Sequence, residues 1–185
     1  MERLDRRTLL AGLMLTALPF SRLAAAQEMS LGSSTDFDFL CHDWRVHHRK
    51  LATRLAGAND WYEFDGTSST RSIMAGFGNV EDNMLEDPHG PYRAAALRGF
   101  DATHELWRIW WLDLRFPTEI GVPVAGAFDG DRGEFFADDS WQGTPIKLRF
   151  IWHKDAGNGP RWEQAFSTDD GRHWETNWTM DFTRR

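Results

Sequence analysis

The stretch 161–182, RWEQAFSTDDGRHWETNWTMDF, carries the most regular pattern in the chain. Apolar and polar residues alternate on both sides of a turn centred on Asp170, and side chains two positions apart on a strand lie on the same face. If residues equally distant from Asp170 pair across the turn, one face of a hairpin carries six residues: Trp162, Gln164, Phe166, Trp174, Thr176 and Trp178. The pattern therefore predicts two antiparallel strands with one largely aromatic face.

The turn of this hairpin matches the pattern called an Asp box, which often marks sialidases and other sugar-active propellers. The matching residues are Ser167, Asp169, Gly171 and Trp174. A propeller carries such boxes on several blades, and a chain of this length with one box cannot build one. We interpret the box as a structural turn, in which Asp169 accepts backbone N–H bonds and Gly171 supplies a positive φ.

Outward from this hairpin, turn signals recur about every 8–14 residues and separate short, aromatic-rich segments. We expect strands at 43–52, 60–72, 79–86, 92–100, 105–114, 122–129, 133–140, 145–153, 161–168 and 173–183. Short connections favour antiparallel pairing of sequential strands, and closure removes exposed edges. The sequence predicts an all-β fold, an up-and-down meander barrel of about ten strands, with a short helical turn near 36–40 lying over one end.

The N-terminal 26 residues have the features of an export signal: arginines near the start, an apolar run over 9–20, and an A-x-A cleavage site before Gln27. The pair Arg6-Arg7 resembles the twin-arginine signal, although Asp5 stands where Ser or Thr is usual; general secretory export stays open. We expect residues 1–26 to be removed, 27–35 to be a flexible tether, and 36–185 to form one barrel domain. The expected location is periplasmic or secreted.

Charge and composition limit the classes of partner that we expect for this protein. The formal net charge is −7, which argues against nucleic acid or anionic lipid as partner, because both require a basic face. The mature chain has no segment that we expect to span a membrane. Cys41 is the single cysteine, so an internal disulfide is excluded and the core alone must stabilise the fold. The oligomeric state is left open.

Three motifs resemble those of a large bacterial family of exported, lipocalin-like β-barrels of unknown function. They are FDFLCHDWRV at 37–46, YRAAALRGFD at 92–101, and the hairpin at 161–182. Trp44 matches the first-strand tryptophan of lipocalins, while His42 stands where their pattern has glycine. The resemblance covers about 36–183, and it implies a small barrel with a hydrophobic interior and a pocket, without implying a reaction.

The ten tryptophans suggest either core packing or an aromatic-lined pocket for an apolar ligand. In LWRIWWLDLRF, 106–116, both faces of the strand are bulky, so periodicity does not tell which face points inward. If Arg98 points inward it must pair with an acid, because an unpaired buried charge is costly. The candidate ligand-binding residues are Trp162, Gln164, Phe166, Thr176, Trp178, Arg98 and Trp110.

Motifs for metals and cofactors are not recognisable. His47 and His48 are adjacent, so on a strand they point to opposite faces and cannot share a metal ion. The segment DGDRGE, 129–134, departs from a calcium loop and is better explained as a hairpin turn. The histidine motif of haem-binding nitrobindin barrels is not recognisable, and no Ser elbow, P-loop or dinucleotide fingerprint appears. We expect no metal site and no cofactor, and catalytic residues are unassigned.

The sequence therefore predicts an exported barrel that binds a small, largely apolar molecule. One alternative is a barrel enzyme, of the isomerase, cyclase or hydratase type, acting on a hydrophobic substrate. A second alternative is a structural envelope module with a filled interior. An internal cavity separates the first two from the third, and a perturbed carboxylate or Arg–acid pair facing that cavity favours an enzyme.

Overall fold

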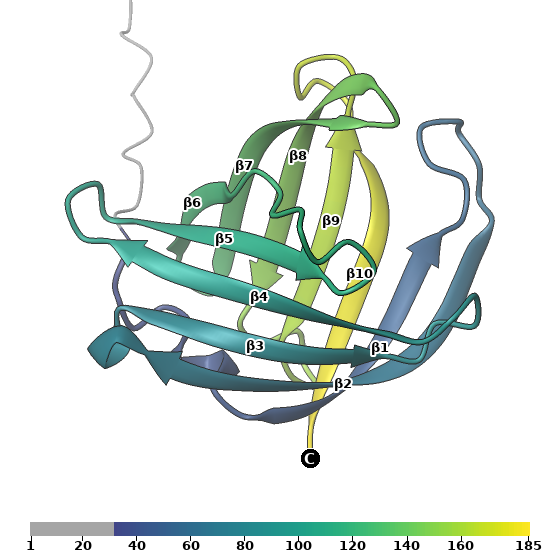
Figure 1. Ribbon diagram of the computed structural model, residues 1–185. Coiled ribbons are helices and arrows are strands. Elements are labelled where there is room, and N and C mark those ends of the chain that lie inside the picture. Colours follow the sequence, from purple (N-terminus) through teal and green to yellow (C-terminus); the bar gives the residue numbers. More distant parts are fainter. Residues whose placement is uncertain (1–31) are drawn as a thin grey trace, which may run out of the picture.

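The computed structural model describes residues 32–185, which form a closed antiparallel barrel (Figure 1). The expected signal at 1–26 lies outside the described residues. One 3-10 turn, η1 (Asp38–Leu40), precedes the barrel, and a second, η2 (Met74–Gly76), joins two strands. The strands are β1 (Asp43–Leu51), β2 (Trp61–Ile73), β3 (Gly78–Leu85), β4 (Tyr92–Asp101), β5 (Leu106–Asp113), β6 (Val124–Asp129), β7 (Arg132–Trp141), β8 (Thr144–His153), β9 (Arg161–Ser167) and β10 (Glu175–Arg184).

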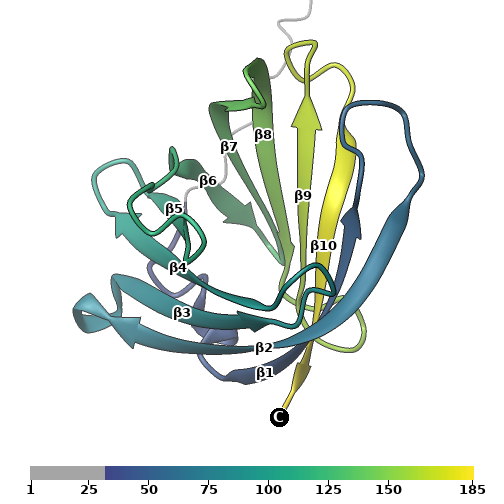
Figure 2. The same ribbon diagram turned by 45° about the vertical axis from the view of Figure 1, so that its right-hand side comes forward.

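The strand order is that of a meander: each strand pairs with its neighbours in sequence, and β1 pairs with β10 to close the barrel. Figure 2 shows β1 lying between β10 and β2. Figure 1 shows β2–β5 crossing steeply over β7–β10, so the barrel is flattened into two crossed layers. The predicted fold class and meander are confirmed, and the expected strand bounds agree with the observed ones to within two residues.

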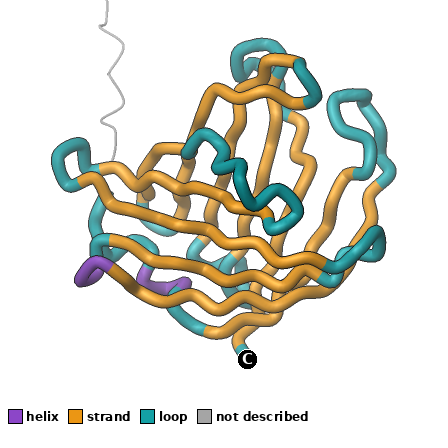
Figure 3. The backbone as a smooth tube through the Cα atoms, in the orientation of Figure 1, coloured by secondary structure: helices purple, strands orange, loops and turns teal. Residues whose placement is uncertain are grey.

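The two ends of the barrel differ in what covers them. At one end, the segment that contains η1 folds beneath the barrel, as the sequence predicted for 36–40 (Figure 3). Phe37 and Leu40 insert into a cluster of aromatic rings and are almost fully buried. The other end is bordered by the β1–β2, β3–β4, β5–β6 and β7–β8 connections. We call these the closed end and the open end.

Residues 32–35, which the sequence assigned to a flexible tether, are attached to the closed end. The Gly32 N–H donates to the carbonyl of Glu105, at 2.9 Å between N and O. The indole N–H of Trp107 donates to the carbonyl of Ser33, also at 2.9 Å. These bonds extend the ordered domain to residue 32.

The register of the last hairpin differs from the prediction. Thr176 pairs with Ala165, and Trp178 pairs with Gln164, because a bulge lies between Thr176 and Trp178. A bulge adds one residue to a strand and reverses which face the residues before it occupy. The prediction that Thr176 shares the inner face with Gln164 is therefore wrong.

Trp174 also leaves the aromatic face on which the simple register placed it. Its ring lies on the outside of the barrel, 4.4 Å from the guanidinium carbon of Arg149 and 6.1 Å from the ring of Phe136. Phe136 is exposed, and Arg149 alternates with the inward-facing Leu148 and Phe150 of β8. The inner face of the hairpin is thus built by Trp162, Gln164, Phe166, Trp178, Met180 and Phe182.

Candidate functional site

A cavity of about 560 Å³ opens into the barrel at the open end. This is within the size range of pockets for small molecules, roughly 300–1,000 Å³. Its walls are apolar because the inward positions of β5 to β10 carry large side chains. Those lining the cavity are Ile109, Trp111, Val124, Trp141, Ile146, Leu148, Phe150, Trp162, Phe166 and Trp178.

The β5–β6 connection, 114–123, forms one side of the cavity mouth. It exposes four large apolar side chains, of which the first two flank Arg115: Leu114, Phe116, Ile120 and Val122. Phe116 and Val122 also line the cavity. The entrance therefore continues the apolar character of the walls.

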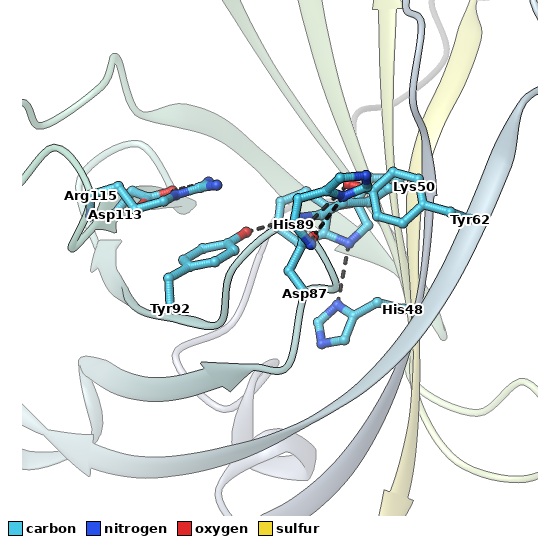
Figure 4. Close-up of polar contacts among 9 residues, drawn as sticks. His48, Lys50, Tyr62, Asp87, His89, Tyr92, Asp113 and Arg115 are labelled. Atoms are coloured by element: carbon cyan, nitrogen blue, oxygen red, sulfur yellow. Dashed lines mark hydrogen bonds and ion pairs between the residues drawn. The ribbon is translucent and has the colours of Figure 1, made fainter.

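Lys50 is the buried cation of the cavity (Figure 4). Alternation along β1 turns Trp44, Val46, His48 and Lys50 inward. The Nζ atom donates to the hydroxyl oxygen of Tyr92 at 2.7 Å and to Oδ2 of Asp87 at 3.4 Å. It also lies 4.0 Å from the centroid of the Trp178 ring, close enough for a cation–π interaction.

Burial changes the protonation of this cluster. Desolvation lowers the pKa of Lys50 to about 8, although the neighbouring Asp87 carboxylate opposes that change. Burial raises the pKa of Tyr92, so its phenol stays neutral. Burial also disfavours ionisation of Asp87, but hydrogen bonds from His89 and the charge of Lys50 hold the pKa of Asp87 below its ordinary value. The resulting group is a neutral phenol beside a carboxylate and an ammonium that titrates near neutrality.

His48 supports the aromatic wall from the next inward position of β1. Its ring stacks on Phe64 with 4.7 Å between centroids, and its Nδ1 accepts the indole N–H of Trp178 at 3.3 Å. Burial, followed by the charge of Lys50, lowers the pKa of His48 to about 3, so the ring is neutral. A side chain at Gly66 would collide with this ring and with the Met84 carbonyl, so glycine is required there.

Two arginines complete the polar groups of the mouth. Arg115 lies over the Tyr92 ring, 3.6 Å from its centroid, and donates to both carboxylate oxygens of Asp113. Arg54, from the β1–β2 connection, lies 4.7 Å from the centroid of Trp141 and is half-buried. The aromatic wall of the cavity therefore ends in a charged rim, where the cations lie among the carboxylates of Asp87, Asp113, Glu119 and Asp139.

The sequence-predicted ligand residues fall into two groups. The structure places Trp162, Gln164, Phe166 and Trp178 together in the cavity wall. Within that wall, the side-chain amide of Gln164 donates to Oδ1 of Asn177 at 2.9 Å. Thr176, the partner expected for Gln164, lies on the other face of the sheet.

Arg98 and Trp110 lie away from the cavity. Arg98 points inward and pairs with Glu81, as the sequence argument required, but at the closed end, over the ring of Phe37. Trp110 pairs with the exposed Leu97 on the outer face, while the adjacent Trp111 faces the cavity. Both faces of β5 are bulky, so the sequence offered no basis for choosing between the two tryptophans.

Sequence reasoning missed Lys50, Arg54, Asp87 and Tyr92. A signal for Lys50 was present, because the alternation from Trp44 reaches it on the inner face. Arg54 and Asp87 lie in connections, where periodicity gives no direction. Their place in the site depends on the barrel bringing the connections of one end together.

The Asp box is a turn on the rim, and its first three members bond to one another and to the turn backbone. Ser167 Oγ accepts the N–H of Gly171 at 2.9 Å, and Asp169 Oδ1 accepts the N–H of His173 at 2.9 Å. Gly171 has a φ of 83°, as the turn requires. The interpretation of the box as a structural turn is confirmed in these contacts, and Ser167 and Asp169 do not line the cavity.

Within residues 32–185, no group of three or more His, Cys, Asp or Glu side chains is arranged to hold a metal ion. The same range has no helix that is long and apolar enough to cross a membrane.

No protein-family model matches the sequence, and no curated protein matches it. The resemblance to exported lipocalin-like barrels therefore stays a prediction.

Proposed function

We propose that the protein binds a small, largely apolar molecule in the open-end cavity. The observation that carries the proposal is a space of about 560 Å³ walled by aromatic and aliphatic side chains. Packed interiors leave few voids larger than a water molecule, so a cavity of this size is not a packing accident. A barrel with only a structural role would be expected to fill this space.

The proposal is tested with the neutral, apolar fluorophore N-phenyl-1-naphthylamine. We expect its fluorescence to rise with saturation, and the tryptophan fluorescence of the protein to be quenched in parallel. Ile146→Trp should reduce binding because it fills the cavity. Leu97→Trp, on the exposed outer face, is the matched control and should bind normally. Absence of saturable binding to the unmodified protein would refute the proposal.

Lys50 supports a second candidate, a barrel enzyme acting on a hydrophobic molecule. Its amine faces the cavity within hydrogen-bond distance of Tyr92, and its pKa of about 8 suits proton transfer near neutral pH. The two candidates differ in what happens to the ligand. Native mass spectrometry of protein from its own host should identify a co-purifying molecule. If the protein only binds this molecule, incubation leaves the molecule unchanged. If the protein is an enzyme, incubation converts the molecule, and Lys50→Met abolishes the conversion.

We further infer that the protein is exported to the periplasm or secreted. The support is the arrangement of residues 1–26, with paired arginines, an apolar run and an A-x-A site. The intact mass of the exported protein should correspond to a chain that begins at Gln27. Changing Arg6 and Arg7 to lysine should block export by the twin-arginine route, and undiminished export would point to the general secretory route.

A further inference from the structure

The cations that line the cavity are not equally compensated. Lys50 has the carboxylate of Asp87 at 3.4 Å, and Arg115 has that of Asp113 at 2.7 Å. Arg54 also lines the cavity, yet within residues 32–185 no carboxylate oxygen lies within 4.0 Å of its guanidinium. Arg54 is thus a cation in an apolar wall without an ion-pair partner from the described chain.

Aromatic rings hold Arg54 in place. Its guanidinium carbon lies 4.7 Å from the centroid of Trp141 and 5.6 Å from that of Phe166. The nearby Glu175 accepts the backbone N–H of Leu55 at 2.7 Å, which commits one of its oxygens elsewhere. Stacking on rings fixes the plane of a guanidinium and leaves its edge available for hydrogen bonds.

The charge of Arg54 is unfavourable in this setting without an anion. Burial lowers the pKa of Arg54, because the rings exclude water from part of the guanidinium, and the charge of Glu175 opposes this change only in part. The charge of Arg54 also contributes to lowering the pKa of Lys50, so the two cations repel each other. An anion bound at the rim would relieve both the desolvation and the repulsion.

We propose that the apolar ligand carries a single carboxylate, which binds to the edge of the Arg54 guanidinium while the apolar body occupies the aromatic cavity. This inference rests on the proposed function and specifies the class of ligand. A guanidinium matches a carboxylate with two parallel N–H···O bonds, the strongest geometry available to one arginine.

The surrounding charges favour a monoanion over a more highly charged group. Asp87 and Asp113 already compensate the other two cations of the cavity, and Glu119 and Asp139 add negative charge to the rim. Apart from these two ion pairs, a phosphate dianion would meet one cation, Arg54, and two carboxylates, those of Glu119 and Asp139. A carboxylate requires only the charge that Arg54 supplies.

The experiment compares two ligands with the same chain length, decanoate and 1-decanol, by isothermal titration calorimetry at pH 7. We expect decanoate to bind at least about tenfold more tightly, since hydrogen bonds to charged groups are stronger than neutral ones. Arg54→Gln should remove the preference by weakening decanoate alone. Arg54→Lys should keep part of it, because the charge is retained without the paired donors.

Arg71→Gln is the matched control, because Arg71 is an exposed arginine on β2 outside the cavity lining. It should leave both affinities unchanged. Equal affinity of the unmodified protein for decanoate and decanol, or a preference that persists in Arg54→Gln, would overturn the carboxylate inference. If N-phenyl-1-naphthylamine still binds in that case, the proposed function stands alone; if none of the three ligands binds, both fail.

Discussion

Two arginines of this barrel are placed against aromatic rings at opposite ends. Arg98 lies over Phe37 and Trp152 at the closed end, with 5.1 and 5.3 Å between its guanidinium carbon and the ring centroids. Arg54 lies over Trp141 at 4.7 Å at the open end. Both guanidinium groups lie against aromatic rings, but the two arginines differ in whether an acidic side chain pairs with them.

At the closed end the buried arginine and its acid are paired within the chain. Arg98 pairs with Glu81 and donates to Asn79 at 2.9 Å, and Ser68 donates to the second oxygen of Glu81 at 2.7 Å. At the open end Arg54 has no such acid among the described residues. Buried charge is thus balanced within the chain at one end, while at the other end it leaves a cation that an anionic ligand can pair with.

The largest expected effect comes from breaking the closed-end pair. Arg98→Met should lower the free energy of unfolding by about 3–5 kcal/mol, because Glu81 is left as an unpaired buried charge. The double variant Arg98→Met/Glu81→Gln should recover part of that loss. Urea unfolding measures both.

Arg54→Met is the open-end counterpart, and we expect it to cost less than about 1 kcal/mol, since no buried acid depends on Arg54. If Arg98→Met and Arg54→Met lowered the free energy of unfolding by similar amounts, the two ends would not differ in how far their stability depends on the arginine.

A matched pair of leucines tests the packing of the two ends. Leu40 is fully buried in the closed end, whereas Leu148 lines the cavity. Leu40→Ala should cost about 2–5 kcal/mol, because it opens a new hole in a filled core. Leu148→Ala should be at the lower end of that range, about 2 kcal/mol or less, since it enlarges a space that already exists. Thermal and urea unfolding would contradict this if Leu148→Ala were the costlier change.

Much of the fold was accessible from the sequence because alternation is a strong signal on half-buried strands. It placed Trp162 and Trp178 inside, and it would have placed Lys50 there too. The bulge between Thr176 and Trp178 was not accessible, because one extra residue leaves no distinct composition. Arg54 could not be assigned either, since its role depends on Trp141, a residue that only the closed barrel brings near it.

The closed end uses an arginine that is paired with an acid, whereas Lys50 at the open end can lose its proton. Its pKa is about 8 when folded and 10.5 in the ordinary state, so between these values the unfolded chain binds more protons. Stability therefore rises with pH in that window. Relative to Lys50→Met, the unmodified protein should gain about 2 kcal/mol of unfolding free energy between pH 7.5 and 9.5.

Titration of the groups that both proteins share cancels in the difference, which therefore reports Lys50. Urea unfolding of both proteins at a series of pH values measures it. Saturating decanoate should shift the rise to higher pH, because an anion near Lys50 favours the charged amine. If the difference in unfolding free energy between the two proteins did not change across this pH range, Lys50 would not be desolvated in the folded protein.

The smallest effect is expected at the Asp box, which lies on the open-end rim outside the cavity. Asp169 forms hydrogen bonds with the side chain and the backbone N–H of His173 and with the hydroxyl of Ser167. These bonds, the His173 side chain first among them, hold the pKa of Asp169 well below its usual range. Asp169→Ala should lower the melting temperature slightly and leave ligand affinity unchanged. Asp138→Ala, an exposed outer-face control, should change neither.

If the box instead belonged to a sugar-cleaving site, glycosidase turnover would be lost in Asp169→Ala at an unchanged melting temperature. Since the acid is engaged by its own turn and does not line the cavity, we expect no such turnover. The two ends then differ in the cavity and in Arg54, which has no acidic partner within residues 32–185.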